Sequence, residues 1–463
     1  MNPMMLVLAM SAGQGPVSPP IAPSAQYPVV RTQAGAQLPL SIPVAQPAAQ
    51  PQPMPMPMAK VDPKAAEPAP EAPAAEEPKE EEAPAPTVYL LERMLKDTWI
   101  GQTMTDHNIR LYGWTAMNYT VGSTRFSNAP MYFNDQPNHF QMNQNWLHFE
   151  KAIDTSKKEF QLGFVTDSIL PGTDARTTIS RGLFDKQLTQ GPLSRDGAIP
   201  PAPIGTSEPY PFDLYQAYVQ AFLPNLGGNG TTVKLGKFAT PFEYEVVQAV
   251  DTPFVSKSYL FEYNPFTHTG VWAQTQLNDT WMVGNAFVLG SDTFINAPTN
   301  RFTYFGQLKW APPEGKNTAL FNFMLTNPKF NTPNAFAFYN AFNFQFTHKF
   351  NDKASYVLDT TYSYMNDNPF VGFADWYGAV NYFIYKHTDK ITSTVRAEVF
   401  NDTQGVRTGF AGLYTEVTYG VAWSPKPGVI LRPSVRYDNN ASSAPFDGKS
   451  DMWTGAFELI FRW

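Results

Sequence analysis

The chain has 463 residues, no cysteine, 14% aromatic and 16% charged residues, and a formal net charge of −7. This acidic balance, without any run of Lys or Arg, argues against a nucleic-acid partner. No run of 18 apolar residues follows residue 13, so an integral membrane protein with this sequence would have to be a closed β-barrel.

The first 86 residues do not have the composition of a folded domain. Residues 1–13 are similar to the apolar part of a secretory signal, but no Lys or Arg precedes Arg31, so we interpret them as a truncated or atypical export signal. Residues 14–86 contain 19 of the 43 prolines and the acidic stretch Glu76–Glu82. Such a composition cannot bury a core and predicts a disordered linker. Residues 87–106 are predicted to be a short helical lead-in, because apolar residues recur at roughly helical spacing in 88–96.

From residue 107 onward the hydrophobic pattern has a period of two, which is typical of β-strands. The clearest case is 336–350, where Phe342, Phe344 and Phe346 share one face with three further phenylalanines. Asn343 and Gln345 lie on the other face together with hydroxyl-bearing and basic residues. An aromatic face opposite an amide face favours a strand between lipid and water over a strand in a soluble core.

Sixteen segments show this pattern or part of it. We place the strands near 107–121, 139–153, 158–168, 212–223, 230–239, 266–277, 280–290, 301–311, 317–326, 336–350, 353–365, 373–386, 389–400, 411–424, 428–438 and 450–463. In 212–223 we expect Tyr215, Ala217 and Val219 on the lipid face. The linkers alternate between tight turns, such as 351–352, and mostly long loops, such as 169–211 and 240–265. This alternation is how outer-membrane barrels are built, and an even strand count places both ends of the barrel on the short-turn, periplasmic side.

The last segment, 450–463, alternates between large apolar residues and mostly polar ones. We interpret it as the closing strand of the barrel, with Trp463 at the periplasmic interface, where amphipathic rings collect. A terminal aromatic residue on the last strand also resembles the signal that barrel-assembly machinery recognises.

If the apolar faces point to lipid, the opposite faces line the lumen. The predicted pore-lining residues are Arg396, Glu398, Glu416, Arg432, Arg436, Glu458 and Arg462. Mixed charges on adjacent strands can pair with one another and stabilise the wall, and this explains most of them. They can also form a charged constriction that sets ion preference, and Arg432 and Arg436 are the strongest candidates for that role.

The longest loop, 169–211, is a second candidate for narrowing the pore. Its charged residues include Asp174, Arg176, Arg181, Asp185 and Lys186. The loop could fold inward as a constriction or remain solvated at the cell surface, and the sequence does not separate these alternatives.

No motif indicates an enzyme, a cofactor or a metal site. His148 and Glu150 have the spacing of a metal-binding pair on one strand face, but no second ligand cluster accompanies them, so a hydrogen bond within the wall is the simpler interpretation. Gly227–Gly230 lacks the Lys-Ser/Thr of a phosphate-binding loop and indicates a turn.

Three stretches resemble the OmpL-like β-barrel porins of bacteria with outer membranes. They are Thr231–Glu245 (TTVKLGKFATPFEYE), Arg396–Asp402 (RAEVFND) with Gly405–Gly409 (GVRTG), and Leu431–Asp438 (LRPSVRYD). The resemblance covers roughly 107–463 and implies a pore. Glu243 departs from the family pattern, which has glycine at this position, so the local turn geometry there is an open question.

The sequence therefore predicts an all-β protein, a transmembrane antiparallel barrel of about sixteen strands over 107–463. Its expected function is that of an outer-membrane porin for passive diffusion of small hydrophilic solutes or ions, since barrels of this size leave an aqueous channel. Expected partners are outer-membrane lipid, barrel-assembly machinery and a homo-oligomer, and the N-terminal segment is expected in the periplasm. The alternatives are a barrel enzyme, a structural anchor, or an all-β carbohydrate-binding surface module.

Overall fold

The computed structural model of the protein describes residues 89–184, 187, 209–295, 302–326, 339–368 and 371–463. All of them belong to one compact unit, Ala83–Trp463. The predicted export signal and linker in 1–86 lie outside the described residues.

Two short helices, α1 (Leu90–Leu95) and α2 (Trp99–Asp106), precede the first strand. The side chain of Thr98 caps α2 by accepting a hydrogen bond from the backbone N–H of Gly101 at 3.2 Å. No helix of the described residues is both long and apolar enough to span a membrane.

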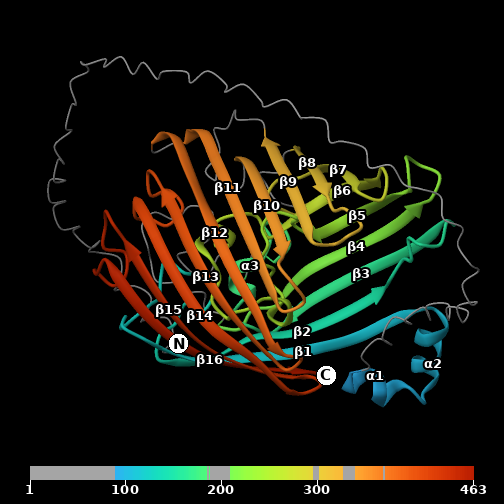
Figure 1. The fold of residues 1–463 in the computed structure, drawn as a ribbon, viewed down its shortest axis with the longest axis horizontal. Coiled ribbons are helices and arrows are strands. Elements are labelled where there is room, and N and C mark those ends of the chain that lie inside the picture. The colour runs from blue at the N-terminus through green and yellow to red at the C-terminus, as the bar shows by residue number, and fades with distance from the viewer. Residues whose placement is uncertain (1–88, 185–186, 188–208, 296–301, 327–338, 369–370) are drawn as a thin grey trace, which may run out of the picture. The chain divides into compact units, whose positions relative to one another are not determined.

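The described residues form sixteen strands. They are β1 (Ile109–Gly122), β2 (His139–Lys151), β3 (Gln161–Leu170), β4 (Asp213–Leu223), β5 (Thr231–Ala239), β6 (Thr267–Gln276), β7 (Trp281–Val288), β8 (Thr303–Trp310), β9 (Asn317–Thr326), β10 (Asn340–Lys349), β11 (Ala354–Asn368), β12 (Gly372–Thr388), β13 (Ile391–Asp402), β14 (Gly412–Lys426), β15 (Val429–Asn440) and β16 (Asp451–Arg462). Each strand pairs antiparallel with its neighbours in the sequence, and β1 pairs with β16 to close the barrel (Figure 1). The predicted fold class is confirmed.

The period of two in the sequence becomes an inward and an outward face. On β1, Asn118 and Thr120 point inward and are buried, whereas Tyr119 and Val121 point outward and are exposed. On β10, Asn343 is buried and Phe344 is exposed in the same way. The alternation follows from the pleat, because successive side chains of a strand leave opposite faces of the sheet.

Large aromatic side chains gather on the outward face near both ends of the strands. Toward the end with the short turns, exposed examples are Trp281, Phe350, Phe383, Trp423 and Phe461. Toward the opposite end, they are Tyr119, Phe140, Phe287, Tyr377 and Trp453. Two such belts separated by a band of apolar residues are typical of barrels that span an outer membrane.

Trp463 completes the closure of the barrel. Its backbone exchanges two hydrogen bonds of 2.8 Å with Gly113 of β1. Its indole lies over Gly113, since a Cβ built on that glycine would be 2.5 Å from Trp463 Cη2, and its Nε1 donates to Thr115 Oγ1 at 3.1 Å. Gly113 is needed here because any side chain would displace the ring.

The expectation that Tyr215 faces lipid is wrong. A β-bulge between β3 and β4 shifts the register next to Tyr215, and the tyrosine is buried with its ring 5.2 Å from that of the inward-facing Trp146. Lys237 Nζ donates to the carbonyls of Leu214 at 2.7 Å and Tyr215 at 2.9 Å. The lysine thus satisfies backbone groups that the bulge removes from the strand ladder.

The connections separate into two sets at the two ends of the barrel. One set is short, as in 277–280, 350–353 and 389–390. The other set is mostly long and includes 123–138, 171–212, 240–266, 403–411 and 441–450. Part of this second set fills the inside of the barrel instead of extending away from it, as the hydrophobic clusters of buried residues demonstrate.

Candidate functional site

The connection between β5 and β6, residues 240–266, folds into the interior of the barrel and is called the inner segment here. It contains a 3₁₀ turn (Ala249–Asp251) and the short helix α5 (Tyr259–Glu262), every residue of which is buried. The Tyr259 and Tyr414 ring centroids lie 5.0 Å apart, and those of Tyr263 and Phe400 lie 5.5 Å apart. Tyr414 and Phe400 belong to β14 and β13, so the inner segment packs directly against the wall.

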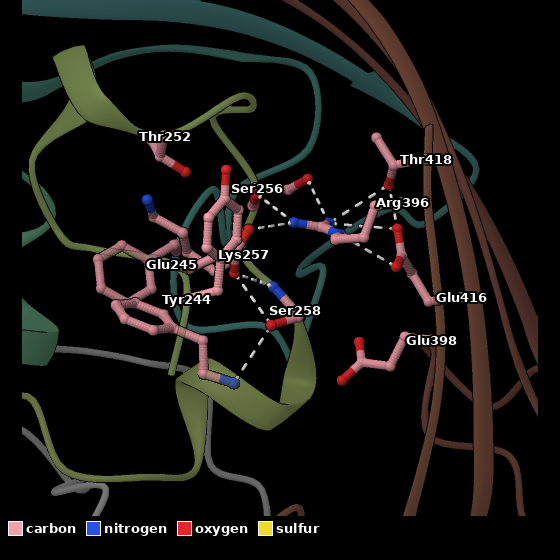
Figure 2. A network of polar contacts seen from close by, with 12 residues as sticks. Tyr244, Glu245, Thr252, Ser256, Lys257, Ser258, Arg396, Glu398, Glu416 and Thr418 are labelled. Atoms are coloured by element: carbon pink, nitrogen blue, oxygen red, sulfur yellow. Dashed lines mark hydrogen bonds and ion pairs between the residues drawn. The ribbon is translucent and has the colours of Figure 1, made fainter. Parts of the chain in front are cut away.

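Arg396 of β13 holds the inner segment to this wall. Its guanidinium donates to Glu245 Oε1 at 2.7 Å and to the carbonyl of Ser256 at 3.0 Å, both in the inner segment. It also pairs with Glu416 of the neighbouring strand at 3.1 Å. Figure 2 shows the side chain reaching from the wall between these partners. Arg396 itself has no exposed surface.

Two arginines of β15 repeat this arrangement. Arg436 donates to the carbonyl of Lys257 at 2.5 Å and pairs with Asp438 at 2.7 Å. Arg432 donates to the carbonyl of Thr252, and its Nε donates to Glu458 at 2.8 Å. Three wall arginines thus each donate to one carbonyl of the inner segment, and we call this set of contacts the arginine latch.

Carboxylates of the wall and of the inner segment bind the start of α5. Glu398 of β13 accepts the backbone N–H groups of Tyr259 at 2.8 Å and Leu260 at 2.7 Å. Glu245 accepts the backbone N–H of Ser258 at 2.8 Å and its hydroxyl at 3.0 Å. These are helix N-terminal amides without partners inside the helix, so carboxylates satisfy them in a buried place.

The surroundings of the inner segment shift the pKa values of its charged groups. Burial lowers the pKa of Lys257 to about 8, although Glu245 acts in the opposite direction. Burial by itself would raise the pKa of Glu245, but Arg396 and Lys257 hold it below its usual value. Glu245 therefore stays ionised inside the barrel because two cations compensate for its loss of water.

A second part of the wall, on β8 to β10, is lined by amides. Gln307 donates to Asn322 at 2.8 Å, and Asn322 donates to Asn343 at 2.9 Å and to the carbonyl of Pro241 at 3.0 Å. This row on β8, β9 and β10 fixes the beginning of the inner segment. The inner segment therefore has contacts to two separate parts of the wall.

Glu243 resolves the question of the missing glycine. It adopts φ +68°, the left-handed conformation in which glycine is favoured. Its carboxyl group accepts from Asn264 at 2.5 Å and from Thr361 at 2.7 Å, and these contacts hold the side chain in place. Burial and the nearby Asp359 raise its pKa well above the usual range. The turn thus has a backbone conformation that glycine favours, and it carries a buried carboxyl group at that position.

The described part of the longest loop also enters the interior. Asp174 accepts from Gln144 Nε2 at 2.7 Å, and the same amide nitrogen donates to the carbonyl of Val247 in the inner segment at 2.6 Å. Burial raises the pKa of Asp174 to about 7. Arg176 pairs with Asp135 at 2.6 Å.

The remaining charged residues of this loop are placed differently. The backbone of Arg181 forms a β-bridge with Thr293. Asp185 and Lys186 lie outside the described residues. That the loop narrows the pore stays a prediction.

A cavity of about 250 Å³ lies between one part of the inner segment, which includes Gln248 and Asp251, and the wall of β1 to β4. Elsewhere the segment contacts this wall directly, because Gln144 of β2 bonds to it and its apolar side chains pack on Trp146. Its lining includes Tyr112, His148, Gln216 and Arg462 of the wall and Asp251 of the inner segment. Of the predicted pore-lining residues, Arg462 borders this cavity. The other six are buried in the arginine latch or next to it, and they are Arg396, Glu398, Glu416, Arg432, Arg436 and Glu458.

His148 is part of a hydrogen-bonded group in the wall. Its Nδ1 lies 2.6 Å from Asp167 Oδ1, and its Nε2 lies 3.2 Å from Glu150 Oε2. Asp167 also accepts from Trp146 Nε1 at 2.9 Å. Both ring nitrogens of the histidine are therefore engaged with wall carboxylates.

Sequence reasoning did not single out Glu245 and Lys257. Both lie in the long linker 240–265, which follows no strand periodicity. Glu245 ends the family-like stretch Thr231–Glu245, but nothing in that stretch marks it as a partner of the wall. The contact between Arg396 and Glu245 joins residues 151 positions apart in the chain. The one available signal was a charged pair within a long loop next to a family-like motif.

The solved structures that this chain is similar to are distant from it in sequence. No curated protein matches the chain. Among solved structures, an anion-selective porin from Comamonas acidovorans has 11% identity and a TM-score of 0.49, covering 77% of this chain and 99% of that one. The outer-membrane channel DcaP of Acinetobacter baumannii has 11% identity and a TM-score of 0.48, covering 77% and 97%. OprB of Pseudomonas putida has 8% identity and a TM-score of 0.49, covering 79% and 96%.

A family model described as putative beta-barrel porin-2, OmpL-like, matches residues 108–462, which is nearly the whole barrel. This match confirms the resemblance seen in the sequence. The chain therefore belongs to this family of OmpL-like barrel porins, and it is a bacterial outer-membrane protein that forms a channel for small solutes.

Proposed function

We propose that the inner segment is the constriction of this channel and that solutes pass between it and the wall of β1 to β4. The arginine latch is the observation that carries this proposal, because it fixes the segment against β13 to β15. The cavity of about 250 Å³ lies on the other side of the segment. A solute moving along that side meets Asp251, Arg462 and the amide of Gln216.

This assignment gives the predicted pore-lining charges two roles. Arg396, Arg432 and Arg436 act as positioning residues that hold the constriction, and their own charges are matched by Glu416, Glu458 and Asp438. Arg462 and Asp251 act on the solute through the field in the cavity, since charged side chains bias ion passage. The protein then works as a channel through shape and electrostatics, without covalent chemistry.

The proposal extends to the surroundings of the barrel. The outward apolar face contacts outer-membrane lipid, the last strand is recognised by barrel-assembly machinery, and copies associate as homo-oligomers. Residues 1–13 direct export, and residues 14–86 form a linker in the periplasm, on the same side as the short turns. Crosslinking of the native protein in membranes tests the association.

The position of the constriction can be tested with single cysteines, because the chain has none of its own. We would record the conductance of full-length Asp251→Cys in planar bilayers before and after a charged, water-soluble thiol reagent. Asp251 is exposed in the cavity, so modification should reduce the single-channel conductance.

The matched control is Lys157→Cys, in the β2–β3 turn, where the side chain is 64% exposed. Its modification should leave conductance unchanged. A fully modified Asp251→Cys channel with unaltered conductance would show that solutes take another route. A folded barrel without any conductance would contradict the open channel itself.

A further inference from the structure

We propose that the hairpin of α1 and α2, residues 89–106, binds the phospholipid surface at the short-turn end of the barrel. This inference rests on the proposed contact of the barrel's outward face with lipid and extends that contact to a part of the chain that forms no strand. The hairpin would then be an interfacial anchor that fixes the first strand relative to the membrane.

The first observation is a set of large apolar side chains that no described residue covers. Met94 is 69% exposed and Trp99 is 76% exposed, and Leu90 and Ile100 on the same two helices are also exposed. Within a hairpin this short, these residues make up most of the apolar surface. Apolar surface left in water lowers stability, so a neighbouring hydrocarbon phase would be a favourable place for it.

The second observation is that the hairpin is held firmly by its opposite side. Glu92 accepts two hydrogen bonds from Arg110 of β1, at 3.0 and 3.2 Å. Tyr89 packs on Tyr112 with ring centroids 5.2 Å apart and accepts from Arg462 at 2.8 Å. These contacts fix the orientation of α1 relative to β1. The exposed apolar face of α1 therefore points in a defined direction.

The two helices are also packed tightly on each other. A Cβ added to Gly101 would lie 2.1 Å from the carbonyl oxygen of Leu95, so only glycine permits the close approach of α2 to the end of α1. The hairpin therefore presents Met94, Trp99 and Ile100 as a fixed unit.

The third observation is a groove that continues the outward face of the barrel. A cavity of about 360 Å³ is lined by Leu95, Met104 and Ile109, with Lys96 and Arg110 also on its border. Ile109 begins the row of outward residues on β1 that leads through Leu111 to Tyr119. The groove therefore continues the outward row of β1, and an acyl chain lying along the barrel wall would reach it.

The exposed charges of the hairpin are two basic residues beside Met94 and two acidic ones, Asp97 and Asp106, which offset them in net charge. Arg93 and Lys96 are exposed on the same short helix as Met94, and neither forms an ion pair among the described residues. Cations beside exposed apolar rings suit a surface of phosphate headgroups above acyl chains. Tryptophan in particular collects at that boundary.

Spin labelling of the full chain tests the inference, because single cysteines can be placed in a chain that has none. Trp99→Cys and Ile100→Cys would be labelled in nanodiscs of phosphatidylethanolamine and phosphatidylglycerol. The accessibility of each label to oxygen and to a water-soluble nickel chelate would be compared. Gln102→Cys is the matched control for Ile100→Cys, since these two positions lie about 200° apart around the helix. Trp99→Cys lies on the same side as Gln102 and is compared with the reference positions alone.

Two reference positions calibrate the measurement. Val435 is 54% exposed on the outward face of β15 and serves as the lipid reference, and Lys157 serves as the water reference. We expect the ratio of oxygen to nickel accessibility to be several-fold higher at position 100 than at position 102. At positions 99 and 100 it should be close to that of position 435.

Labels at 99 and 100 that resemble the one at 157 would overturn the inference. Dipolar broadening between labels at these positions would also overturn it, because it would show a second copy of the chain on this face. If the label at 435 were itself in water, the proposed lipid contact of the barrel would fail, and this outcome is distinguishable from failure of the hairpin anchor alone.

Discussion

At the scale of single residues, burial sets the chemistry of the charged groups inside the barrel. Asp174 is 5% exposed, and burial raises its pKa to about 7 from an ordinary value of 3.8. Between these values the folded protein holds more protons than the unfolded chain. The free energy of unfolding therefore falls as the pH rises from about 4 to about 7, and the loss is complete above that.

Asp174→Asn should remove this dependence. We expect the variant to be more stable than the natural protein at pH 8, by about 1 kcal/mol or more, and nearly equal to it at pH 4. The new amide can keep the contact with Gln144 and can also donate to Asn143 Oδ1, which has no hydrogen-bond partner. Urea unfolding in detergent at the two pH values measures the difference.

Asp154→Asn is the matched control. Hydrogen bonds from Ser156 lower the pKa of this exposed turn residue. Ionisation of Asp154 above pH 4 therefore stabilises the folded protein, and protonation of Asp154 does not. Its substitution should not stabilise the protein at pH 8. A less stable Asp174→Asn variant at pH 8 would show that the ionised carboxylate is better compensated than its burial indicates.

At the scale of elements, the inner segment depends on the wall for its position. Arg396→Met would leave the buried carboxylates of Glu245 and Glu416 without their shared cation. Loss of one partner from a buried ion pair costs about 3–5 kcal/mol, so we expect lower stability against urea. The segment should also move more freely, which single-channel recording would show as a larger and noisier conductance.

The double variant Arg396→Met with Glu416→Gln separates charge from packing. Removing one orphaned carboxylate should restore part of the stability while the latch remains broken. Recovery of stability without recovery of the original conductance is the expected result. Unchanged conductance in both variants would mean that the inner segment stays in place through its other contacts and that the arginine latch does not position it.

At the scale of the whole molecule, closure of the barrel depends on the last residue. Deletion of Trp463 would remove the two backbone hydrogen bonds to Gly113 and the ring that covers it. Sheet closure removes the unpaired edges of β1 and β16, so the truncated chain should refold to the closed barrel more slowly and in lower yield. The heat-modifiable fraction on detergent gels measures that yield.

Phe461→Ala is the control for an outward aromatic ring on the same strand that leaves the terminal backbone pair intact. Its yield should stay closer to that of the natural protein. Gly113→Val should resemble the truncation, because its side chain would occupy the place of the Trp463 ring. Equal yields for all three variants would show that the other pairs between β1 and β16 suffice for closure.

The sequence determined the barrel because its signals are local. Each strand carries its own alternation, as in Asn343 beside Phe344, and each short turn follows directly from the strand before it. The same alternation along each strand assigned the charged residues of the last strands to the lumen. A local pattern fails where the backbone departs from regular geometry, and Tyr215 at the β-bulge is the example.

The tertiary structure alone decided what the lumen contains. The residues of 240–266 have no period, and their partners lie on strands far along the chain, as with Glu245 and Arg396 or Ser256 and Arg396. Contacts of this kind depend on the three-dimensional closure of sixteen strands, which no window of the sequence contains. The sequence by itself therefore determined that a wall of charged and amide side chains faces inward, and only the folded barrel decided which segment those side chains hold.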